Sequence, residues 1–366
     1  MRQITASQLD DIALGAAVLG TGGGGDPYIG KLMAKAAMDR NGPVTMLDPS
    51  EVDDDALVIP AGMMGAPTVM LEKIPRGTEI ISAFEAIQNY LGRKATATMS
   101  VEAGGLNSTT PFVVAAELGI PLVDADMMGR AFPEIQMVMP SLYGIKATPM
   151  AIADEKGNSA ILNTINNKWT ETLARTMTVD MGCSAMLAAF AMSGAQVKEA
   201  GVARTITQIE IIGRIIRAAQ AAHVDPIEAV RGATGGFVVW RGKVTDVARR
   251  TETGFARGDA FISGVGKYEG KTLRISFQNE FLIAATDDEI LVTTPDLITV
   301  LDAETGHPVT TETMRYGFRV AVLGMPCDRR WRTPGGLALV GPGYFGYQTD
   351  YRPIEERYGE QNRDSV

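Results

Sequence analysis

The segment ATATMSVEAGGLNSTTPFVVAAELGIPLVDAD, residues 95–126, decides the fold class. Its apolar runs at 96–102 and 121–126 indicate strands, and the stretch 111–118 between them indicates a helix that begins at a proline. Strands that alternate with helices predict a layered α/β domain with a mostly parallel sheet. Ligands bind such sheets at the carboxyl ends of the strands, so polar residues at those ends are candidate site residues.

The same alternation extends through the first 166 residues. We expect further strands at 44–47, 56–60 and 79–83, and a further helix at 29–38. These elements predict one N-terminal α/β domain, residues 1–166.

The second half of the chain follows different patterns. Residues 170–194 indicate a helix or a helix pair, and residues 205–222 indicate an amphipathic helix. After Gly235, short runs of alternating apolar and polar residues indicate strands and turns. We therefore predict a C-terminal β-rich α+β domain, residues 167–355, followed by a flexible tail, residues 356–366.

The composition is typical of a folded protein with two domains. The chain has 366 residues, of which 45% are hydrophobic, so each domain can bury a core of its own. The net charge is −9 and the basic residues are scattered, which argues against nucleic acid or a membrane as a partner. The N-terminal segment lacks the pattern of a signal peptide, and two cysteines make no disulfide framework. We expect a cytoplasmic protein.

Histidine is rare, and this restricts the chemistry. His223 and His307 are the two histidines of the chain, which is fewer than a binuclear metal hydrolase uses. His223 ends an amphipathic pattern and His307 precedes a proline, so we expect structural roles for both. Carboxylates, amides, hydroxyls, backbone dipoles or a thiol are left to carry any reaction.

The first candidate motif is the glycine loop GTGGGGDP, residues 20–27. A helix rather than a strand precedes it, and no GK[ST] follows, so neither a dinucleotide-binding fold nor a P-loop is indicated. The backbone N–H groups of the loop could form a nest for an anionic substrate group. A tight connection that needs positive φ angles is the alternative. The candidate substrate-binding residues of this loop are Gly22, Gly23, Gly24, Gly25 and Asp26.

The second motif, VEAGGLNSTTP, follows the strand at 96–102. Glu102 ends that strand beside the start of a helix, which suits a general base or a substrate anchor. Asn107 and Ser108 are candidate substrate-binding residues, although hydroxyl groups at this position can also serve only as helix caps.

The third motif is PLVDADMMGRAFPEIQM, residues 121–137. Asp124 and Asp126 are two residues apart on a strand, so we expect both carboxylates on one face, where they share a proton or a cation. Arg130 and Glu134 follow and complete the candidate set. A solvated loop in which Arg130 only balances charge is the alternative.

Two single residues are further candidates. Cys183 is a possible nucleophile, but a cysteine in an apolar, helical run is more often a small buried hydrophobe. Asn279 interrupts an apolar alternation and must find a hydrogen-bond partner, either in a ligand or in the protein.

In order and spacing, GTGGGGDPY, EAGGLNS and VDADMMGRAFPEIQM resemble the bacterial S-methyl thiohydantoin desulfurase-like family, which is related to the hydantoinase/oxoprolinase group. The likeness continues through DMGCSA, residues 180–185, to TPGGLALVGPGYFG, residues 333–346. The resemblance implies an N-terminal α/β domain, a C-terminal β-rich domain, and removal of sulfur from a thiolated or S-methylated hydantoin ring.

The candidate residues are compatible with a hydrolase of this kind. Water would attack the ring carbon between the two nitrogens and expel methanethiol or sulfide, with Glu102, Asp124 or Asp126 as the base. Asn107, Arg130 and the N–H groups of the glycine loop could hold the ring carbonyl. A divalent metal, if one is bound, would be held by Asp124, Asp126 and Glu134. A thiolate of Cys183 is the rival nucleophile.

Two other functions remain open at this point. One is an ATP-dependent, ring-opening hydantoinase or oxoprolinase subunit, although the glycine loop contains no lysine or arginine to hold phosphates. The other is a non-catalytic accessory subunit that binds a small molecule. In each case we expect a small hydantoin-like ligand and assembly into a homo-oligomer.

Overall fold

The computed structural model describes residues 1–65, 69, 73 and 75–359. Within them, the first half of the chain builds a sheet with the strand order β1-β2-β5-β4-β3-β9-β7-β8, and β10 pairs with β3 outside this path. The strands are β1 (Arg2–Ile4), β2 (Val44–Leu47), β3 (Leu57–Gly65), β4 (Ala97–Ser100), β5 (Leu122–Val123), β7 (Met150–Ala153), β8 (Ser159–Leu162), β9 (Ser184–Ala188) and β10 (Met192–Ser193).

The centre of this sheet is parallel and its flanks are antiparallel. β2 pairs with β5, β5 with β4, and β4 with β3, all in parallel. β1 joins β2 in the antiparallel sense, and so do β9 and β10 on β3. The predicted α/β class is therefore confirmed, with the parallel part in the middle of a mixed sheet.

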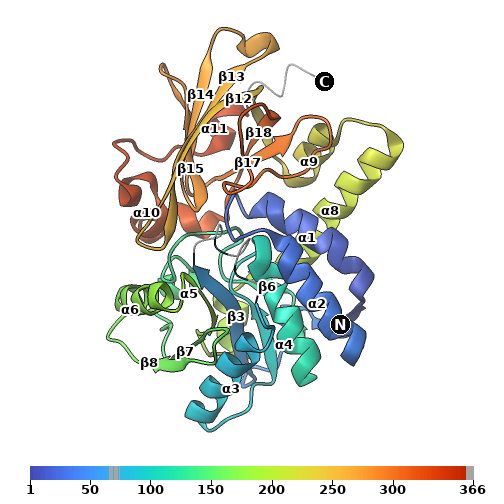
Figure 1. The fold of residues 1–366 in the computed structure, drawn as a ribbon, viewed down its shortest axis with the longest axis vertical. Coiled ribbons are helices and arrows are strands. Elements are labelled where there is room, and N and C mark those ends of the chain that lie inside the picture. Colours follow the sequence, from blue (N-terminus) through green and yellow to red (C-terminus); the bar gives the residue numbers. More distant parts are fainter. Residues whose placement is uncertain (66–68, 70–72, 74, 360–366) are drawn as a thin grey trace.

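Helices cover the faces of this first sheet, as Figure 1 shows. They include α2 (Pro27–Asn41), α3 (Glu79–Leu91), α4 (Thr110–Leu118) and α6 (Asn167–Asp180). The shorter α7 (Gly194–Ala200) packs against β10, and α5 (Met139–Leu142) packs against α7. α2 and α4 lie on one side of β3, and α6 lies on the other. Pro111 occupies the first turn of α4, and Gly119 ends the helix in the left-handed conformation that glycine adopts without strain. None of the helices in the described part of the chain is long and apolar enough to cross a membrane.

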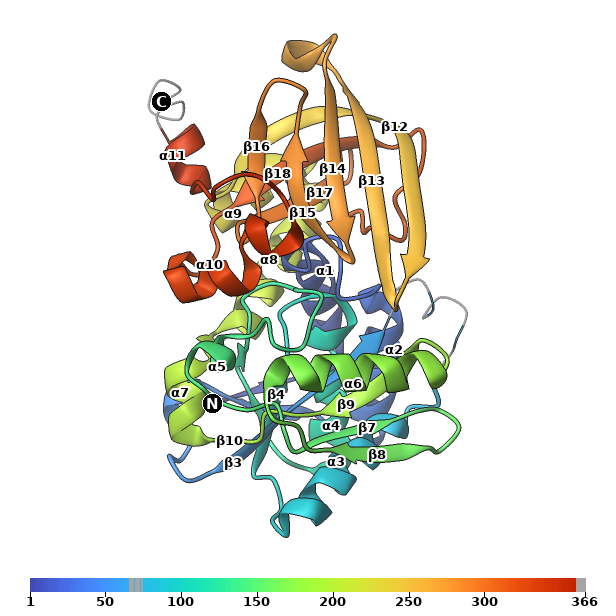
Figure 2. The same cartoon turned by 90° about the vertical axis from the view of Figure 1, so that its left-hand side faces the viewer.

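The second half builds an antiparallel sheet with the order β16-β15-β14-β13-β12-β18-β17. Its strands are β12 (Phe237–Glu252), β13 (Phe255–Gly264), β14 (Thr272–Gln278), β15 (Glu280–Ala285), β16 (Ile290–Thr293), β17 (Leu297–Asp302) and β18 (Arg319–Met325). It has its own core, which includes Trp240, Ile262, Ile275 and Phe281. Figure 2 shows this sheet stacked above the first half, with its long strands directed toward it. The predicted β-rich C-terminal part is confirmed.

Two helices that are distant in sequence pack closely between the halves. α1 (Leu9–Leu19) lies against α8 (Thr205–Ala222), which leads into α9 (Pro226–Thr234). A Cβ atom on Gly15 would lie 1.8 Å from the carbonyl oxygen of Ile209, and one on Gly213 would lie 1.9 Å from that of Asp11. Each helix therefore has a glycine where the backbone of the other touches it.

Two predicted elements are wrong. Residues 79–83 belong to helix α3 rather than to a strand, because the apolar residues Ile80, Ala83, Phe84 and Ile87 continue at helical spacing beyond that short window and are all buried. A helix or a helix pair is predicted at 170–194, whereas the structure has one helix there, α6, and the rest of the segment forms the strands β9 and β10. Gly182 and Cys183 both have positive φ angles and end the helical part.

The predicted division of the chain at residue 166 coincides with the N-cap of α6. Strands β9 and β10 follow this point in sequence but pair in the first sheet, so the division does not separate the two sheets and stays a prediction about folding units. The expected tail begins inside α11 (Ile354–Tyr358), which the buried side chain of Ile354 holds against the second core. Residues 360–366 lie outside the described part.

We predict that Gly15→Ala destabilises the protein by about 1–3 kcal/mol, because the new methyl group overlaps a backbone atom of α8 that cannot move alone. Gly232→Ala is the matched control. Gly232 lies in the exposed part of α9 with nothing within 4 Å of its Cβ position, so alanine there should stabilise by about 1 kcal/mol through helix propensity. Urea unfolding of both variants measures the difference, and equal stability of the two would refute the close contact.

Candidate active site

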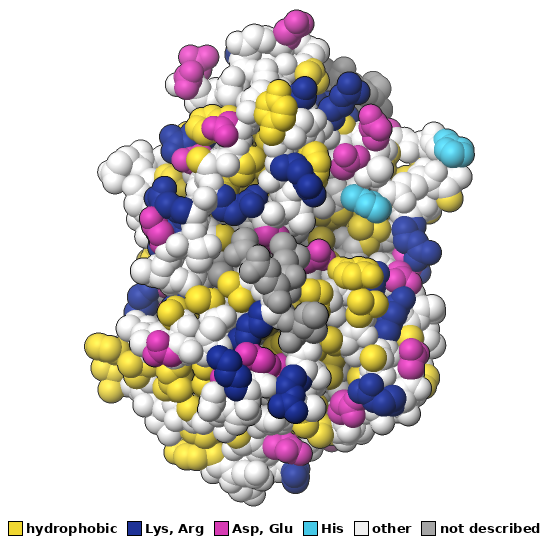
Figure 3. Space-filling model, viewed as in Figure 1, with side chains coloured by type: hydrophobic (Ala, Val, Ile, Leu, Met, Phe, Trp, Pro, Cys, Tyr) yellow, Lys and Arg dark blue, Asp and Glu magenta, His cyan; other side chains and the backbone are white. Residues whose placement is uncertain are grey.

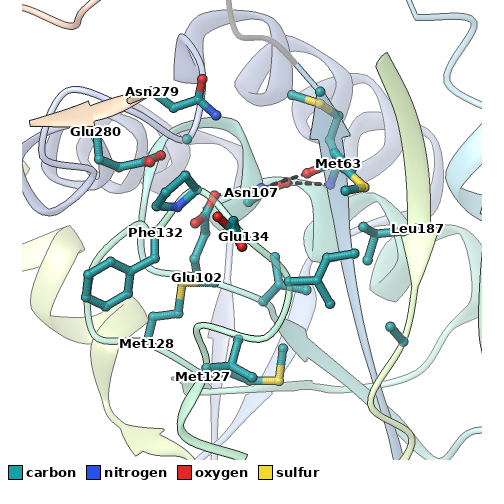
Figure 4. Close-up of a pocket in the computed structure, with 18 of the residues that line it drawn as sticks. Met63, Glu102, Asn107, Met127, Met128, Phe132, Glu134, Leu187, Asn279 and Glu280 are labelled. Atoms are coloured by element: carbon teal, nitrogen blue, oxygen red, sulfur yellow. Dashed lines mark hydrogen bonds between the residues drawn. The ribbon is translucent and has the colours of Figure 1, made fainter. Parts of the chain in front are cut away.

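A cavity of about 80 Å³ lies between the two halves of the molecule (Figure 4). It is bounded by the ends of β3 and β4, the segment 127–138, β9, and the turn between β14 and β15. A buried water needs roughly 10–15 Å³ of such space, so the cavity has room for several waters or for a small planar ring. Its apolar lining includes Met63, Met127, Met128, Phe132, Val138 and Leu187.

Five of the polar residues around the cavity are Glu102, Asn107, Glu134, Asn279 and Glu280. The first four are site residues that the sequence predicts, and so is Gly24, which also lines the cavity. Glu280 was missed. It is the first residue of β15, and only the tertiary arrangement shows that the β14–β15 turn points into the first half of the molecule.

Asn107 holds the end of β3 in place. β4 stops pairing with β3 at Ser100, and beyond that point the Asn107 carboxamide takes over the free edge of β3. Its Oδ1 accepts a 2.6 Å hydrogen bond from the Met63 N–H, and its Nδ2 donates to the Met63 carbonyl at 3.2 Å. The same Nδ2 donates to Glu102 Oε1 at 2.7 Å, so Asn107 also orients the carboxyl group of Glu102.

Glu102 is a buried acid in a polar backbone cradle. Its carbonyl oxygen accepts hydrogen bonds from Ser100 Oγ at 2.6 Å and from Ser108 Oγ at 3.4 Å, which fixes the chain at this residue. Burial raises the pKa of Glu102 to about 8, and the nearby charge of Asp126 adds to this, while the hydrogen bond from Asn107 opposes it. Ser108 is thus a support of Glu102 and does not line the cavity.

Glu280 is the second buried acid. Burial raises its pKa well above the usual range, and repulsion by Glu102 acts in the same direction. Its Oε2 atom is buried and has no hydrogen-bond partner among the described residues. A buried oxygen without a partner is costly, so this atom is where a ligand or a water would bind. Figure 4 shows both acids directed toward the same space.

Asn279 positions the turn that carries Glu280. It adopts a left-handed conformation with φ of 57°, and its Oδ1 accepts a 2.8 Å hydrogen bond from the N–H of Ala256. Its own N–H donates to the carbonyl of Ala256 at 2.7 Å. The side-chain N–H₂ makes no hydrogen bond with the described residues and faces the cavity.

Arg130 does not line the cavity, which corrects its expected role as a holder of the ring carbonyl. It is fully buried, and its Nη1 donates to the carbonyls of Pro295 and Asp296, both at 2.8 Å. Its Nη2 donates to Thr21 Oγ1 at 2.9 Å and its Nε to the carbonyl of Ala131 at 3.0 Å. No nitrogen is left for a substrate.

Arg130 is nevertheless a buried positive charge that favours ionisation of both acids. Burial lowers its pKa to about 10, while Glu280 and Glu102 act in the opposite direction. A guanidinium with that pKa is still charged at neutral pH. It therefore compensates one negative charge on the Glu102–Glu280 pair.

Asp126 lies beside the site and faces away from the cavity. Its carboxylate accepts hydrogen bonds from the N–H groups of Ala103 at 2.6 Å, Met128 at 3.0 Å and Gly129 at 2.8 Å. Burial still raises its pKa to about 7. These bonds tie the segment after Glu102 to the segment after β6 (Ala125–Asp126), so Asp126 supports the site wall.

The three carboxylates expected to hold a metal do not come together. Asp124 accepts hydrogen bonds from the N–H and hydroxyl of Thr207 near the start of α8. Glu134, at the rim of the cavity, is bound by Lys168 and by the Tyr344 hydroxyl, and the contact with Lys168 helps to keep its pKa low. Across the described ranges, no group of three His, Cys, Asp or Glu side chains is placed to hold a metal ion.

The glycine loop packs tightly against residues of the second half of the chain. It therefore has no space for an anion, and its expected role as an anion nest is wrong. A Cβ on Gly22 would lie 2.4 Å from the ring of Phe281, and one on Gly23 would lie 2.0 Å from Glu280 Oε1. The carbonyl of Gly22 accepts from Thr311 N–H, and that of Gly24 accepts from Leu106 N–H, both at 2.9 Å.

The rest of the loop is structural as well. The backbone of Gly25 lies against Gly105, and the side chain of Asp26 accepts from the N–H of Tyr28 at 2.8 Å. Asp26 is the N-cap of α2. Only Gly24 of this set lines the cavity.

Cys183 lies in the turn between α6 and β9 rather than in a helix. It is half-buried, has a φ of 64°, and donates its N–H to the carbonyl of Thr178 at 2.8 Å. It is not one of the residues that line the cavity. The geometry therefore favours a structural role for this residue.

Comparisons with known proteins agree with this architecture. A family model described as S-Me-THD-like, N-terminal domain, matches residues 7–164, and one described as S-Me-THD-like, C-terminal domain, matches residues 165–354. A crystal structure of a protein from Chromobacterium violaceum has the same fold, with a TM-score of 0.82 and 22% sequence identity over 97% of this chain and 100% of that chain. No curated protein matches the chain.

We predict that Arg130→Met destabilises the protein by about 3–5 kcal/mol, because it leaves buried carbonyl oxygens without donors and two buried acids without a positive charge. Arg319→Met is the control, since this side chain is 75% exposed and its replacement should change stability by less than about 0.5 kcal/mol. Denaturant unfolding measures both. A loss at Arg130 as small as that at Arg319 would contradict the structural role.

We also predict a pH dependence of stability. The pKa of Glu102 is about 8 in the folded state and near its ordinary value when unfolded, so the folded protein binds the extra proton. The free energy of unfolding should therefore fall as pH rises from about 4.5 to about 8. Glu102→Gln removes this contribution and should flatten the profile in that window. An unchanged slope in the variant would show that Glu102 is ionised throughout.

Proposed function

Because the chain belongs to the S-Me-THD-like family, we propose that it is a hydrolase that removes sulfur, as methanethiol or sulfide, from a hydantoin-like ring. The observation that supports this most is the pair of buried acids, Glu102 and Glu280, at a mostly apolar cavity of ring size. Raised carboxyl pKa values at a cavity are typical of groups that move protons in catalysis.

The two acids supply complementary proton-transfer groups. Burial raises the pKa of both acids, that of Glu102 to about 8, so both carboxyls hold a proton at acidic and neutral pH. As the pH rises toward 8, one proton leaves first and the charge left behind opposes loss of the second, so one carboxyl is then ionised while the other is protonated. The ionised carboxylate takes a proton from a water molecule while the oxygen of that water bonds to the ring carbon between the two nitrogens. The protonated carboxyl donates its proton to the ring nitrogen, which gives a tetrahedral carbon that carries the new hydroxyl and the S-methyl group. The carboxylate left by that donation then takes the hydroxyl proton, while the carboxyl that accepted the proton of water gives it to the sulfur. The C–S bond breaks as the carbonyl forms, methanethiol leaves, and both acids return to their starting states.

The remaining lining fits the binding of an S-methylated ring. The free N–H₂ of Asn279 is placed to donate a hydrogen bond to a ring carbonyl. Phe132, Met63 and Met127 offer apolar and sulfur contacts for the S-methyl group. In this assignment Asn107 and Asp126 are positioning residues, because their hydrogen bonds are used within the protein.

The geometry does not favour an ATP-dependent subunit. In the described part of the loop, Gly22, Gly23 and Gly24 lie against Phe281, Glu280 and Gly104 at distances that leave no space for phosphates. The other alternative, an accessory subunit that binds a small molecule without catalysis, is distinguished from the proposed hydrolase by the turnover experiment below. The cytoplasmic location and the homo-oligomer stay predictions.

We predict that Glu280→Gln and Glu102→Gln each lower turnover of an S-methylated thiohydantoin by about 10²–10⁴, since each removes a proton-transfer group. Methanethiol release measures activity and thermal unfolding checks the fold, which both variants should retain because glutamine removes the need to bury a charge. Cys183→Ser is the control and should keep substantial activity. Ligand-induced stabilisation without any turnover in the unmodified protein would instead indicate the accessory binding subunit.

A further inference from the structure

The outer face of the second sheet carries an unusual concentration of arginine. On β14, Leu273, Ile275 and Phe277 are buried in the second core, so the alternate residues 274, 276 and 278 lie on the opposite face. A second cavity, of about 190 Å³, lies on that face, and we call it the basic pocket. Its polar lining includes Arg250, Arg257, Arg274, Asp259, Ser276 and Gln278. In Figure 3 basic side chains are visible over the upper half of the molecule, where Figure 1 shows this sheet.

Two of the arginines lie directly opposite each other. Arg250 on β12 pairs with Arg257 on β13, and Arg257 in turn pairs with Gln278 on β14. Directly opposed residues of antiparallel strands project from the same face with Cβ atoms about 4.5–5.5 Å apart, and like charges in this position destabilise a sheet. The arrangement therefore calls for a compensating negative charge.

The acids of the protein compensate only part of this charge. Arg274 forms two hydrogen bonds with Asp259, both at 2.9 Å, and Arg250 forms a 2.7 Å ion pair with the exposed Glu252. No carboxylate among the described residues forms an ion pair with Arg257, whose recorded interaction is a cation–π contact with Phe255 at 5.6 Å. The N–H groups of the half-buried Arg257 guanidinium therefore have no acceptor among the described residues.

Gln278, which pairs with Arg257 across the sheet, carries a second hydrogen-bond donor without a partner among the described residues. The Nε2 atom of Gln278 is buried and makes no hydrogen bond with the described residues. The residue as a whole is 6% exposed and lines the pocket. Tyr347 and Phe345 complete the wall beside it. A buried donor without an acceptor costs free energy unless a ligand supplies the acceptor.

We propose that the basic pocket binds a small oxyanion, the carboxylate or phosphate group of a small molecule. The fork of Arg257 matches two oxygens of such a group, the N–H₂ of Gln278 donates to another lone pair, and the bound charge relieves the repulsion between Arg250 and Arg257. The pocket shares no lining residue with the candidate active site, so this proposal does not depend on the proposed function.

The test is thermal unfolding of the full chain in increasing inorganic phosphate and, separately, malonate, with sodium chloride added to hold ionic strength constant. In the unmodified protein we expect a saturating rise in melting temperature of at least about 2 °C. In Arg257→Gln the rise should be lost, while the variant without anion should melt at or above the unmodified protein because the opposed charge is gone. Arg319→Gln, an exposed arginine of the same sheet, should keep the full rise.

A rise with one anion supports the proposal and identifies the group as phosphate or carboxylate, and a rise with both supports an oxyanion site of broad specificity. The proposal is overturned if neither anion stabilises the protein. It is also overturned if sodium chloride alone gives the same rise, or if Arg257→Gln responds like the unmodified protein.

Discussion

The buried guanidinium of Arg130 is the interaction on which the site and the joining of the two halves depend. It donates to Thr21 in the glycine loop and to the carbonyls of Pro295 and Asp296 in the second half, and it supplies the positive charge beside Glu102 and Glu280. A fully buried charge is tolerated only when its hydrogen bonds are complete and an opposite charge lies near. Here the partners come from three separate segments, so these segments must lie together for the charge to be tolerated.

The same requirement explains why two acids can exist in an apolar cavity. Removing a carboxylate from water favours its protonated form, and two carboxylates near each other favour it further. The positive charge of Arg130 favours ionisation of one of them, and the repulsion between the acids then opposes ionisation of the other, so the two protons are lost in separate steps. Between these two steps one acid can accept a proton while the other can donate one, and the hydrogen bond from Asn107 Nδ2 orients the carboxyl group of Glu102.

Sequence patterns predicted most of the helices and strands correctly, but they predicted the roles of individual side chains less well. The strand at 44–47 and the helix at 111–118 follow from local periodicity and capping, and both are present. Glu102 and Asn107 were identified because strand ends in parallel sheets meet at one edge, and both line the cavity. Arg130 was assigned to a substrate because a sequence shows the donors of an arginine but not the carbonyls that occupy them. Glu280 could not be identified, since its place depends on a turn from the other sheet.

Glu280 lies in the second half of the chain and Glu102 in the first, so changes in one half affect the acid in the other. The two acids come from segments about 180 residues apart, yet the charge of Glu102 raises the pKa of Glu280. A substitution at one position therefore changes the selective value of a substitution at the other. Exchange of C-terminal halves between relatives would conserve activity only where the incoming turn between the equivalents of β14 and β15 carries an acid that suits the resident one. On the proposed function, the two halves therefore act as one unit, even though each has its own hydrophobic core.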